Sequence, residues 1–293
     1  MEHLLKGLGV ALITPFQKNY KVDYKILENL VEEQISGGTD YIVALGTTGE
    51  TPTLSDEEQK EVISCICKTV NKRVPVIMGM GGNDPARVIK NIEKTNFEDI
   101  QGILSVTPFY NKPSQNGLIE YYKKISEASP VPVILYNVPG RTGTNMLPET
   151  TVKIAKTCSN VIAVKEASGI CGQAGKIVKD GPSDFAVISG DDGLTLPIMS
   201  IGGVGVISVL ANALPEHMSM MVHLANEGNF ISARKLHSQL LNFFKLLFKE
   251  GNPCGIKALL EIMGKANNVL RLPLYPISKE LYNDIEKEIK KIL

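Results

Sequence analysis

Residues 41–70 have the sequence YIVALGTTGETPTLSDEEQKEVISCICKTV, which contains one complete strand–turn–helix unit. The apolar run at its start lacks polar alternation, as is typical of a strand covered on both faces of a parallel sheet. Ser55 followed by Glu58 is a capping-box signature, and Val62 and Ile66 then fall on one helical face. The unit therefore predicts an α/β fold with parallel strands.

The same unit recurs along the chain. Helical periodicity follows each apolar run, as in the stripe of Leu27, Leu30 and Val31. Eight alternations predict a closed (β/α)8 TIM barrel, whereas the alternative, a doubly wound open sheet, more often has fewer strands and an early glycine fingerprint. The eight predicted strands are Gly9–Ile13, Tyr41–Leu45, Val74–Met78, Ile103–Val106, Val133–Tyr136, Val161–Val164, Phe185–Ile188 and Val204–Val209.

The chain continues well beyond its eighth apolar run, from Leu210 to Leu293, which is far more than one closing helix needs. We expect two parts, a barrel over residues 1–226 and a C-terminal helical extension over residues 227–293 packed on its side. Proline and glycine punctuation separates four helical patterns in this part of the chain. The predicted helices are 215–226, 230–249, 253–263 and 278–292.

Composition excludes some partners and favours a compartment. Lys+Arg and Asp+Glu each number 31, so no net field favours nucleic acid or an anionic membrane. No segment has the length of a membrane span, and the N-terminus lacks the features of a secretory signal. The five scattered cysteines are expected to be buried free thiols, so a cytoplasmic location is predicted.

Lys165 is the first candidate for chemistry. It ends the sixth apolar run, in the sequence VIAVKEASG over 161–169. Strand C-termini form the active-site mouth of such barrels, and burial there lowers the pKa of an amine. A neutral amine can attack a ketone and form a Schiff base. The alternative is a lysine that simply reaches solvent.

Two aromatic hydroxyls and one guanidinium lie at neighbouring strand ends. Tyr136 closes the fifth run and could pass protons to a substrate carbonyl, or it could be a half-buried packing residue. Tyr110 follows the fourth run with the same ambiguity. Arg141, in a Pro–Gly loop, could bind a carboxylate in bidentate fashion, although a solvated loop arginine is equally consistent with the sequence.

The turn after the second run is a candidate anion site. Thr47 and Thr48, flanked by glycines, offer hydroxyl and backbone N–H donors to a carboxylate, although a capped strand-to-helix turn explains the same residues. Neither a dinucleotide fingerprint nor a P-loop is present, so no nucleotide cofactor is expected. Histidine spacing predicts no metal site, and Asp191 and Asp192 are interpreted as helix N-terminal residues rather than ligands.

Taken together and in order, these features resemble the 4-hydroxy-tetrahydrodipicolinate synthase family, formerly called dihydrodipicolinate synthase, within the pyruvate-dependent class I aldolases. The resemblance covers most of the chain. It is carried by Gly46–Glu50 (GTTGE), Thr107–Asn111 (TPFYN), Tyr136–Gly143 (YNVPGRTG), Val164–Ala167 (VKEA), Ser189–Asp192 (SGDD), Gly202–Ser208 (GGVGVIS), Asn252–Pro253 with Lys257, and Arg271–Leu274 (RLPL).

The resemblance implies a lysine Schiff base without a cofactor. Lys165 would condense with pyruvate and then release the product of its reaction with L-aspartate 4-semialdehyde, on the route to diaminopimelate and lysine. It further implies a homodimer, usually paired into a tetramer, in which Tyr110 reaches the neighbouring site. The other implied roles are carboxylate binding by Thr47 and Thr48, a proton relay through Tyr136, Thr48 and Tyr110, second-substrate binding by Arg141, and a pocket lined by backbone groups of Gly190 and Ile207.

The sequence departs from the resemblance at the positions of the family's lysine-inhibition site. Lysine-inhibited relatives often have a histidine pair, a glutamate and an extra tyrosine there. An arginine in place of a carboxylate would repel a lysine ammonium, so weak or absent feedback by L-lysine is predicted. The aligned residues are Asp56, Gln59, Arg87 and Phe109, with Asn83 retained.

Two other functions remain open from the sequence. A sialic acid lyase or a 2-keto-3-deoxy-sugar-acid aldolase would keep Lys165 and Tyr136, but sialic acid lyases usually have GSTGE and lack the arginine seen at Arg141. A non-catalytic barrel that binds an oxo acid is a further alternative, because fold alone does not establish function.

Overall fold

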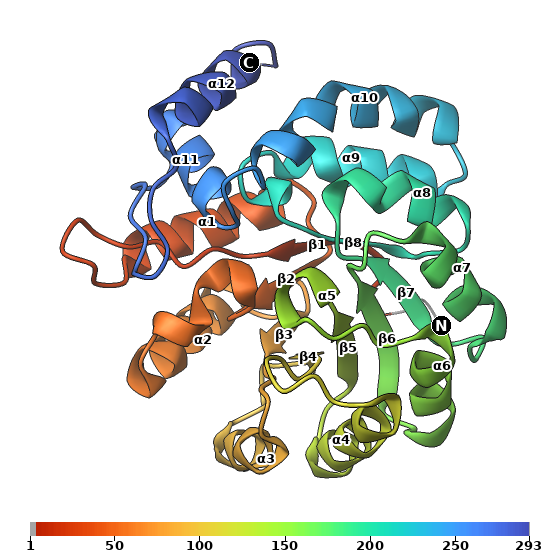
Figure 1. Cartoon of the computed structure of the whole chain (residues 1–293). Coiled ribbons are helices and arrows are strands. Elements are labelled where there is room, and N and C mark those ends of the chain that lie inside the picture. Colours follow the sequence, from red (N-terminus) through yellow and green to blue (C-terminus); the bar gives the residue numbers. More distant parts are fainter. Residues whose placement is uncertain (1–3, 293) are drawn as a thin grey trace.

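A computed structural model describes residues 4–292 and confirms the predicted (β/α)8 barrel (Figure 1). Eight parallel strands close in sequence order, and β8 pairs with β1 through Gly7 opposite Gly205 and Val10 opposite Ser208. The strands are β1 (Gly7–Ala11), β2 (Tyr41–Ala44), β3 (Val76–Gly79), β4 (Gly102–Val106), β5 (Val133–Asn137), β6 (Val161–Glu166), β7 (Ala186–Ser189) and β8 (Gly205–Ser208).

Each predicted apolar run overlaps its strand, but the predicted and observed bounds differ by up to two residues, as at β1, β3 and β6. Leu12 and Ile13 follow β1, and both are buried in the loop beyond the strand. Val74 precedes Pro75, whose carbonyl accepts from the backbone N–H of Ile42 just before β3 begins. Burial extends past the ladder hydrogen bonds, so a run of apolar residues overestimates or shifts a strand.

Helices surround the barrel in the predicted alternation. Ser55 and Glu58 form the predicted capping box at the start of α2, and the stripe of Leu27, Leu30 and Val31 is buried. The helices of this ring are α1 (Tyr24–Ser36), α2 (Asp56–Val70), α3 (Pro85–Lys94), α4 (Gln115–Ala128), α5 (Pro139–Thr142), α6 (Pro148–Thr157), α7 (Cys171–Asp180), α8 (Thr195–Ser200) and α9 (Pro215–Asn226).

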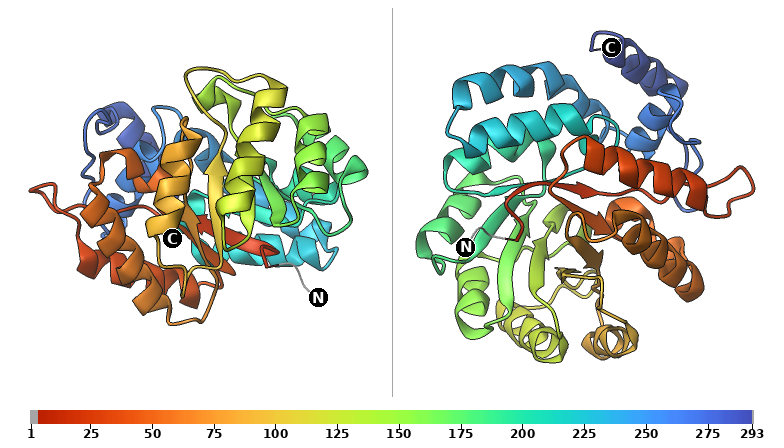
Figure 2. Two further views of the ribbon diagram at one scale, coloured as in Figure 1. Left: turned by 90° about the horizontal axis from the view of Figure 1, so that it is seen from below. Right: turned by 180° about the vertical axis from the view of Figure 1, so that it is seen from behind.

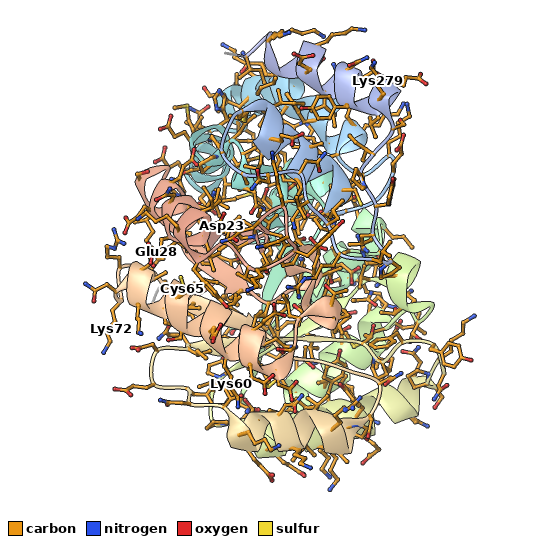
Figure 3. The ribbon with its side chains drawn as sticks, turned by 90° about the vertical axis from the view of Figure 1, so that its left-hand side faces the viewer. Asp23, Glu28, Lys60, Cys65, Lys72 and Lys279 are labelled. Atoms are coloured by element: carbon orange, nitrogen blue, oxygen red, sulfur yellow. The ribbon has the colours of Figure 1, made fainter. Side chains whose placement is uncertain are left out.

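The flank formed by α1 and α2 shows how neighbouring helices pack (Figure 3). Asp23 caps α1 by accepting from the backbone N–H of Ile26, and the Cys65 thiol of α2 lies 3.9 Å from the Tyr24 carbonyl of α1. Lys72 projects outward beyond the end of α2 (Figure 3). The five cysteines are free, as predicted, but only Cys158 and Cys254 are fully buried, because the other three lie on helix faces at the edge of the packed layer.

Three further helices follow the ring: α10 (Phe230–Leu246), α11 (Cys254–Ile262) and α12 (Lys279–Ile289). Helix α10 packs outside α9, and α12 lies farthest from the barrel (Figures 1 and 2). Lys265, beyond α11, returns to the barrel, where it forms an ion pair with Glu33 and donates to the Ala213 carbonyl at 3.0 Å. Among residues 4–292, no helix is long and apolar enough to cross a membrane.

Two apolar layers hold the barrel. The larger lies between the strands and the surrounding helices. The smaller fills the barrel interior with side chains from alternate strand positions, including Tyr41, Ile134 and Ile207. On β6 the alternation places Ala163 and Lys165 inward while Val164 packs outward. This period of two decides which side of the barrel each polar side chain faces.

The closure of the ring predicts a severe effect of one methyl group. A Cβ on Gly205 would lie 1.9 Å from the Gly7 carbonyl oxygen, so β1 and β8 would have to separate. We expect Gly205→Ala to cost about 2 kcal/mol or more in the free energy of unfolding, measured by chemical denaturation. Gly172→Ala is the matched control, since a Cβ there meets nothing within 4 Å, and it should change stability by less than about 1 kcal/mol. Equal stability of the two variants would contradict this account.

Candidate active site

The C-terminal ends of the strands open into a cavity of about 1070 Å³. It contains most of the residues singled out from the sequence. Thr47, Thr48, Tyr136, Arg141 and Lys165 all line it. They come from the ends of β2, β5 and β6 and from the short helix α5, so separate strand ends meet at one opening as the barrel geometry requires.

Lys165 is placed at the centre of this site by strand pairing. It is opposite Tyr136 in the β5–β6 register, and its Nζ lies 4.4 Å from the centroid of the Tyr136 ring. Only 6% of the residue is exposed. Burial lowers its pKa from 10.5 to about 8; the carboxylate of Asp192 opposes this shift and the positive charge of Arg141 adds to it. A neutral amine is therefore accessible near neutral pH.

The residue after Lys165 explains why β6 is held so firmly. Glu166 faces outward and is buried, where its carboxylate accepts from the Gln173 side chain at 3.0 Å and from the Ser168 backbone N–H at 2.7 Å. The Asn137 amide on β5 donates to it at 3.1 Å. These bonds satisfy a buried carboxylate and tie β6 to β5 and α7. Lys165 thus projects inward from a rigid strand.

Tyr136 has a buried phenol with a hydroxyl neighbour. Burial raises its pKa, while the charge of Arg141 and a hydrogen bond with the Thr47 side chain act in the opposite direction. The phenol thus keeps its proton at neutral pH and can donate it. The resemblance assigned the relay hydroxyl to Thr48, but the hydroxyl that contacts Tyr136 is that of the exposed Thr47. Residue order alone does not tell which of two adjacent threonines faces the phenol.

Thr48 and Arg141 share a partner that sequence reasoning missed. Thr48 is 3% exposed, and its Oγ1 accepts from Nδ2 of Asn252 at 3.0 Å. Arg141 donates from Nη2 to the Asn252 backbone carbonyl at 3.2 Å. Asn252 lies just before α11, far from both in sequence. Its only signal in the sequence was its place in an Asn–Pro pair within the family-like motifs.

The remaining predicted residues lie around the cavity rather than on its wall. A Cβ on Gly190 would be 3.1 Å from the Cγ of Lys165, so Gly190 packs against the stem of that lysine. Ile207 belongs to the interior apolar layer. Tyr110 is 85% exposed and has a φ of 72°, in the left-handed region. Gly190 thus supports the lysine, Ile207 belongs to the layer inside the barrel, and Tyr110 points away from this chain's own packed surface.

The pair Asp191 and Asp192 lies at a helix start, as predicted: Asp191 caps the helix, and the side chain of Asp192 binds elsewhere. Its Oδ2 accepts from the backbone N–H groups of Val209 at 3.1 Å and Leu210 at 2.9 Å, at the start of the 3₁₀ helix Leu210–Asn212. The buried carboxylate thus fixes the segment that follows β8. Its negative charge also favours the ammonium form of Lys165 and so raises the pKa of that lysine. Among residues 4–292, no group of three His, Cys, Asp or Glu side chains is arranged to hold a metal ion.

The cavity also extends outward between α2 and α3. Its outer wall includes all four residues that depart from the family's lysine-inhibition site, namely Asp56, Gln59, Arg87 and Phe109. Asn83 lines a smaller cavity of about 340 Å³ beside α4. The site of the predicted departure is therefore continuous with the catalytic mouth.

Comparison with known proteins places the chain in a family. Residues 4–292 match the model of the dihydrodipicolinate synthetase family. The chain is 51% identical to a 4-hydroxy-tetrahydrodipicolinate synthase of Parabacteroides distasonis over 98% of this chain and 97% of that protein. The corresponding protein of Flavobacterium psychrophilum is 44% identical, with 98% of each chain covered.

Solved structures agree with the sequence comparison. The dihydrodipicolinate synthase of Thermotoga maritima superposes with a TM-score of 0.96 at 39% identity, covering 99% of both chains. The enzyme of Aquifex aeolicus gives a TM-score of 0.95 at 40% identity, covering 98% of both. The fold, the order of the motifs and the full-length match agree, and this chain belongs to the dihydrodipicolinate synthetase family.

Proposed function

We propose that this protein condenses pyruvate with L-aspartate 4-semialdehyde to give 4-hydroxy-tetrahydrodipicolinate. The observation that carries this proposal is the buried Lys165 amine, with its pKa of about 8, facing a phenol inside a cavity at the barrel's C-terminal end. A non-catalytic binding barrel gains nothing from a desolvated nucleophile at this place. The family relationship supports the choice of substrates.

The chemistry follows from the positions of the side chains. The Lys165 amine adds to the ketone carbon of pyruvate, and loss of water gives an imine. Removal of a methyl proton yields an enamine, whose carbon attacks the aldehyde carbon of the second substrate while the aldehyde oxygen takes a proton. The amine of that substrate then adds to the imine carbon and displaces Lys165, which closes the ring. Tyr136 is the nearest phenol for the proton transfers, with Thr47 as its relay partner.

Two carboxylates must be held during this sequence. Thr48, near the floor of the turn, offers its hydroxyl to the pyruvate carboxylate together with backbone N–H groups of the same turn. Arg141, on α5, offers a guanidinium to the carboxylate of the semialdehyde. The positive charge that binds the second substrate also adds to the effect of burial in lowering the pKa of Lys165. Substrate binding and nucleophile activation are thus coupled through Arg141.

We further infer a homodimer as the smallest active unit, paired into a tetramer, and a cytoplasmic location. An exposed aromatic residue with left-handed backbone is costly unless something uses it, and Tyr110 has both features on the strand-end side of the barrel. Its insertion beside the exposed Thr47 of a second copy would complete the hydroxyl relay. Five free thiols suit a reducing compartment.

Trapping of the imine tests the reaction class. Borohydride reduction with pyruvate, followed by peptide mass mapping, should place the adduct on Lys165. Lys165→Ala should lower kcat by about 10³-fold or more while leaving the thermal unfolding temperature nearly unchanged. Cleavage of N-acetylneuraminate by the wild-type protein, in place of condensation with the semialdehyde, would instead favour the sialic acid lyase alternative. The absence of any adduct would favour a non-catalytic barrel.

A charge removal should move the pH profile in a known direction. Loss of the nearby positive charge in Arg141→Ala favours the ammonium form of Lys165, so its pKa rises above about 8. The rate of imine formation should then reach its plateau at higher pH, with the plateau itself unchanged. The KM for the semialdehyde should rise about tenfold or more. Unaltered semialdehyde kinetics would remove Arg141 from the mechanism.

Two exposed tyrosines with left-handed backbone, Tyr110 and Tyr20, allow a matched test of the site proposed to be shared between subunits. Tyr110→Ala should lower kcat by about 10²-fold, because the relay loses its last hydroxyl. Tyr20 has a φ of 66° and is 59% exposed, yet it lies outside the site, so Tyr20→Ala should retain activity. Sedimentation should show the wild type as a dimer or larger. A fully active wild-type monomer would contradict the shared site.

Feedback by L-lysine is expected to be weak or absent. The Arg87 side chain on the outer cavity wall would repel the ammonium group of the effector. Titration of L-lysine against initial rate should therefore show little inhibition up to millimolar concentrations. Arg87→Glu should increase sensitivity by restoring an attractive charge. Strong inhibition of the wild type at physiological concentrations would refute this prediction.

A further inference from the structure

Asn252 contacts both of the groups proposed to bind substrate carboxylates. It lies in the C-terminal part of the chain, between α10 and α11, and is 6% exposed. Its side-chain Nδ2 donates to Thr48 Oγ1 at 3.0 Å, and its backbone carbonyl accepts from Arg141 Nη2 at 3.2 Å. One residue from outside the strand ends therefore joins two binding groups, one in the turn after β2 and one on α5 after β5.

The chemistry of the side-chain contact fixes its direction. An amide nitrogen can donate but cannot accept, so the Thr48 hydroxyl must be the acceptor. The hydroxyl proton is then left free to be donated elsewhere. A carboxylate is an acceptor and needs such a donor. Asn252 thereby sets Thr48 as a hydrogen-bond donor toward the cavity, which Thr48 lines.

A buried ion pair keeps Asn252 in register with the threonine turn. Glu50, the residue that ends this turn, has a φ of 54° and pairs with Lys257 of α11, and both side chains are fully buried. Lys257 also donates to the Val269 carbonyl at 2.9 Å, and the Arg271 backbone N–H donates to Glu50 at 3.0 Å. The Glu50–Lys257 pair and the Arg271–Glu50 hydrogen bond thus fix the turn that carries Thr48 to the segment that carries Asn252.

We propose that Asn252 is a positioning residue that selects the 2-oxo acid carboxylate by holding the Thr48 hydroxyl as a donor. The proposal rests on the function proposed above, since it assigns a source for the specificity of the same cavity. The backbone carbonyl of Asn252 also holds Arg141, the group proposed to bind the carboxylate of the second substrate. The C-terminal extension is therefore part of the substrate-binding machinery and not only a covering layer.

Two substitutions at one position separate positioning from packing. Asn252→Ala removes the donor, and the KM for pyruvate should rise about tenfold while kcat changes little. Asn252→Asp keeps the shape but accepts the Thr48 proton and adds a negative charge, so its KM for pyruvate should rise further than that of Asn252→Ala. A purely structural role predicts the opposite order, because the aspartate fits the site better. The KM for the semialdehyde should stay nearly constant in both, since the backbone carbonyl is retained.

A matched control lies in the same part of the chain. Asn267 also donates from its side chain to the barrel, to the Phe16 carbonyl at 3.4 Å, but it does not line the cavity. Asn267→Ala should leave the KM for pyruvate unchanged. Thermal unfolding of each variant reports whether the extension still packs. If Asn252→Ala does not fold, the nearly isosteric Asn252→Asp still decides the question.

A double-mutant cycle with Thr48→Val tests whether Asn252 acts through Thr48. In the Thr48→Val background, Asn252→Ala should cause no further loss of pyruvate affinity. Fully additive effects, or a wild-type KM in Asn252→Asp, would overturn the proposal. Borohydride trapping of pyruvate by the wild type distinguishes failure of the Asn252 proposal from failure of the proposed function. A wild type that traps pyruvate together with variants of unchanged KM rejects only the role of Asn252, whereas a wild type that traps nothing rejects the proposed function.

Discussion

The desolvation of a single amine is the constraint on which the site depends. Lys165 is inside the barrel mouth because the period of two on β6 directs it inward, and the outward Glu166 is held by a full set of hydrogen bonds. Removing an ammonium from water is costly, so the folded state favours the neutral amine. Asp192 partly compensates this cost. The pKa of about 8 is the balance between burial, one carboxylate and one guanidinium.

Lys257 is a second buried lysine whose pKa is lowered by burial, but its role is structural. Lys257 also has its pKa lowered to about 8 by burial, but it is paired with the buried Glu50 and does not line the cavity. Breaking such a pair leaves an uncompensated charge, so the pair strongly disfavours separation of its two segments. Here those segments are the threonine turn after β2 and helix α11. The Asp192 carboxylate near Lys165 accepts from the backbone N–H groups of Val209 and Leu210 through one oxygen, whereas Lys257 is held directly by its carboxylate partner.

The C-terminal extension thereby links the covering layer to the chemistry. Arg271 donates to the Thr53 carbonyl at 2.7 Å and to Glu58 of the α2 capping box at 2.7 Å. Its guanidinium lies 4.5 Å from the Phe16 ring centroid. The extension thus holds the start of α2, the turn before it and the Thr48 hydroxyl as one unit. Loops at a barrel mouth are ordinarily mobile, and this arrangement keeps one of them fixed.

The sequence by itself determined the barrel, its strand order and most of the candidate site residues that meet at the cavity. Eight apolar runs at regular intervals, each followed by helical periodicity, are local signals, and strand C-termini must share one end of a parallel barrel. Lys165, Tyr136, Thr47, Thr48 and Arg141 could therefore be found without coordinates.

Only the tertiary structure decided which of those residues touch. It showed that Thr47 contacts the Tyr136 hydroxyl, that Asn252 bridges Thr48 and Arg141, and that Asp192 contacts the end of β8. These contacts join positions separated by up to 204 residues. Hydrophobic periodicity cannot predict these contacts, because local sequence determines only the helices and strands. The direction of each side chain and the path of the C-terminal extension depend on packing across the whole fold.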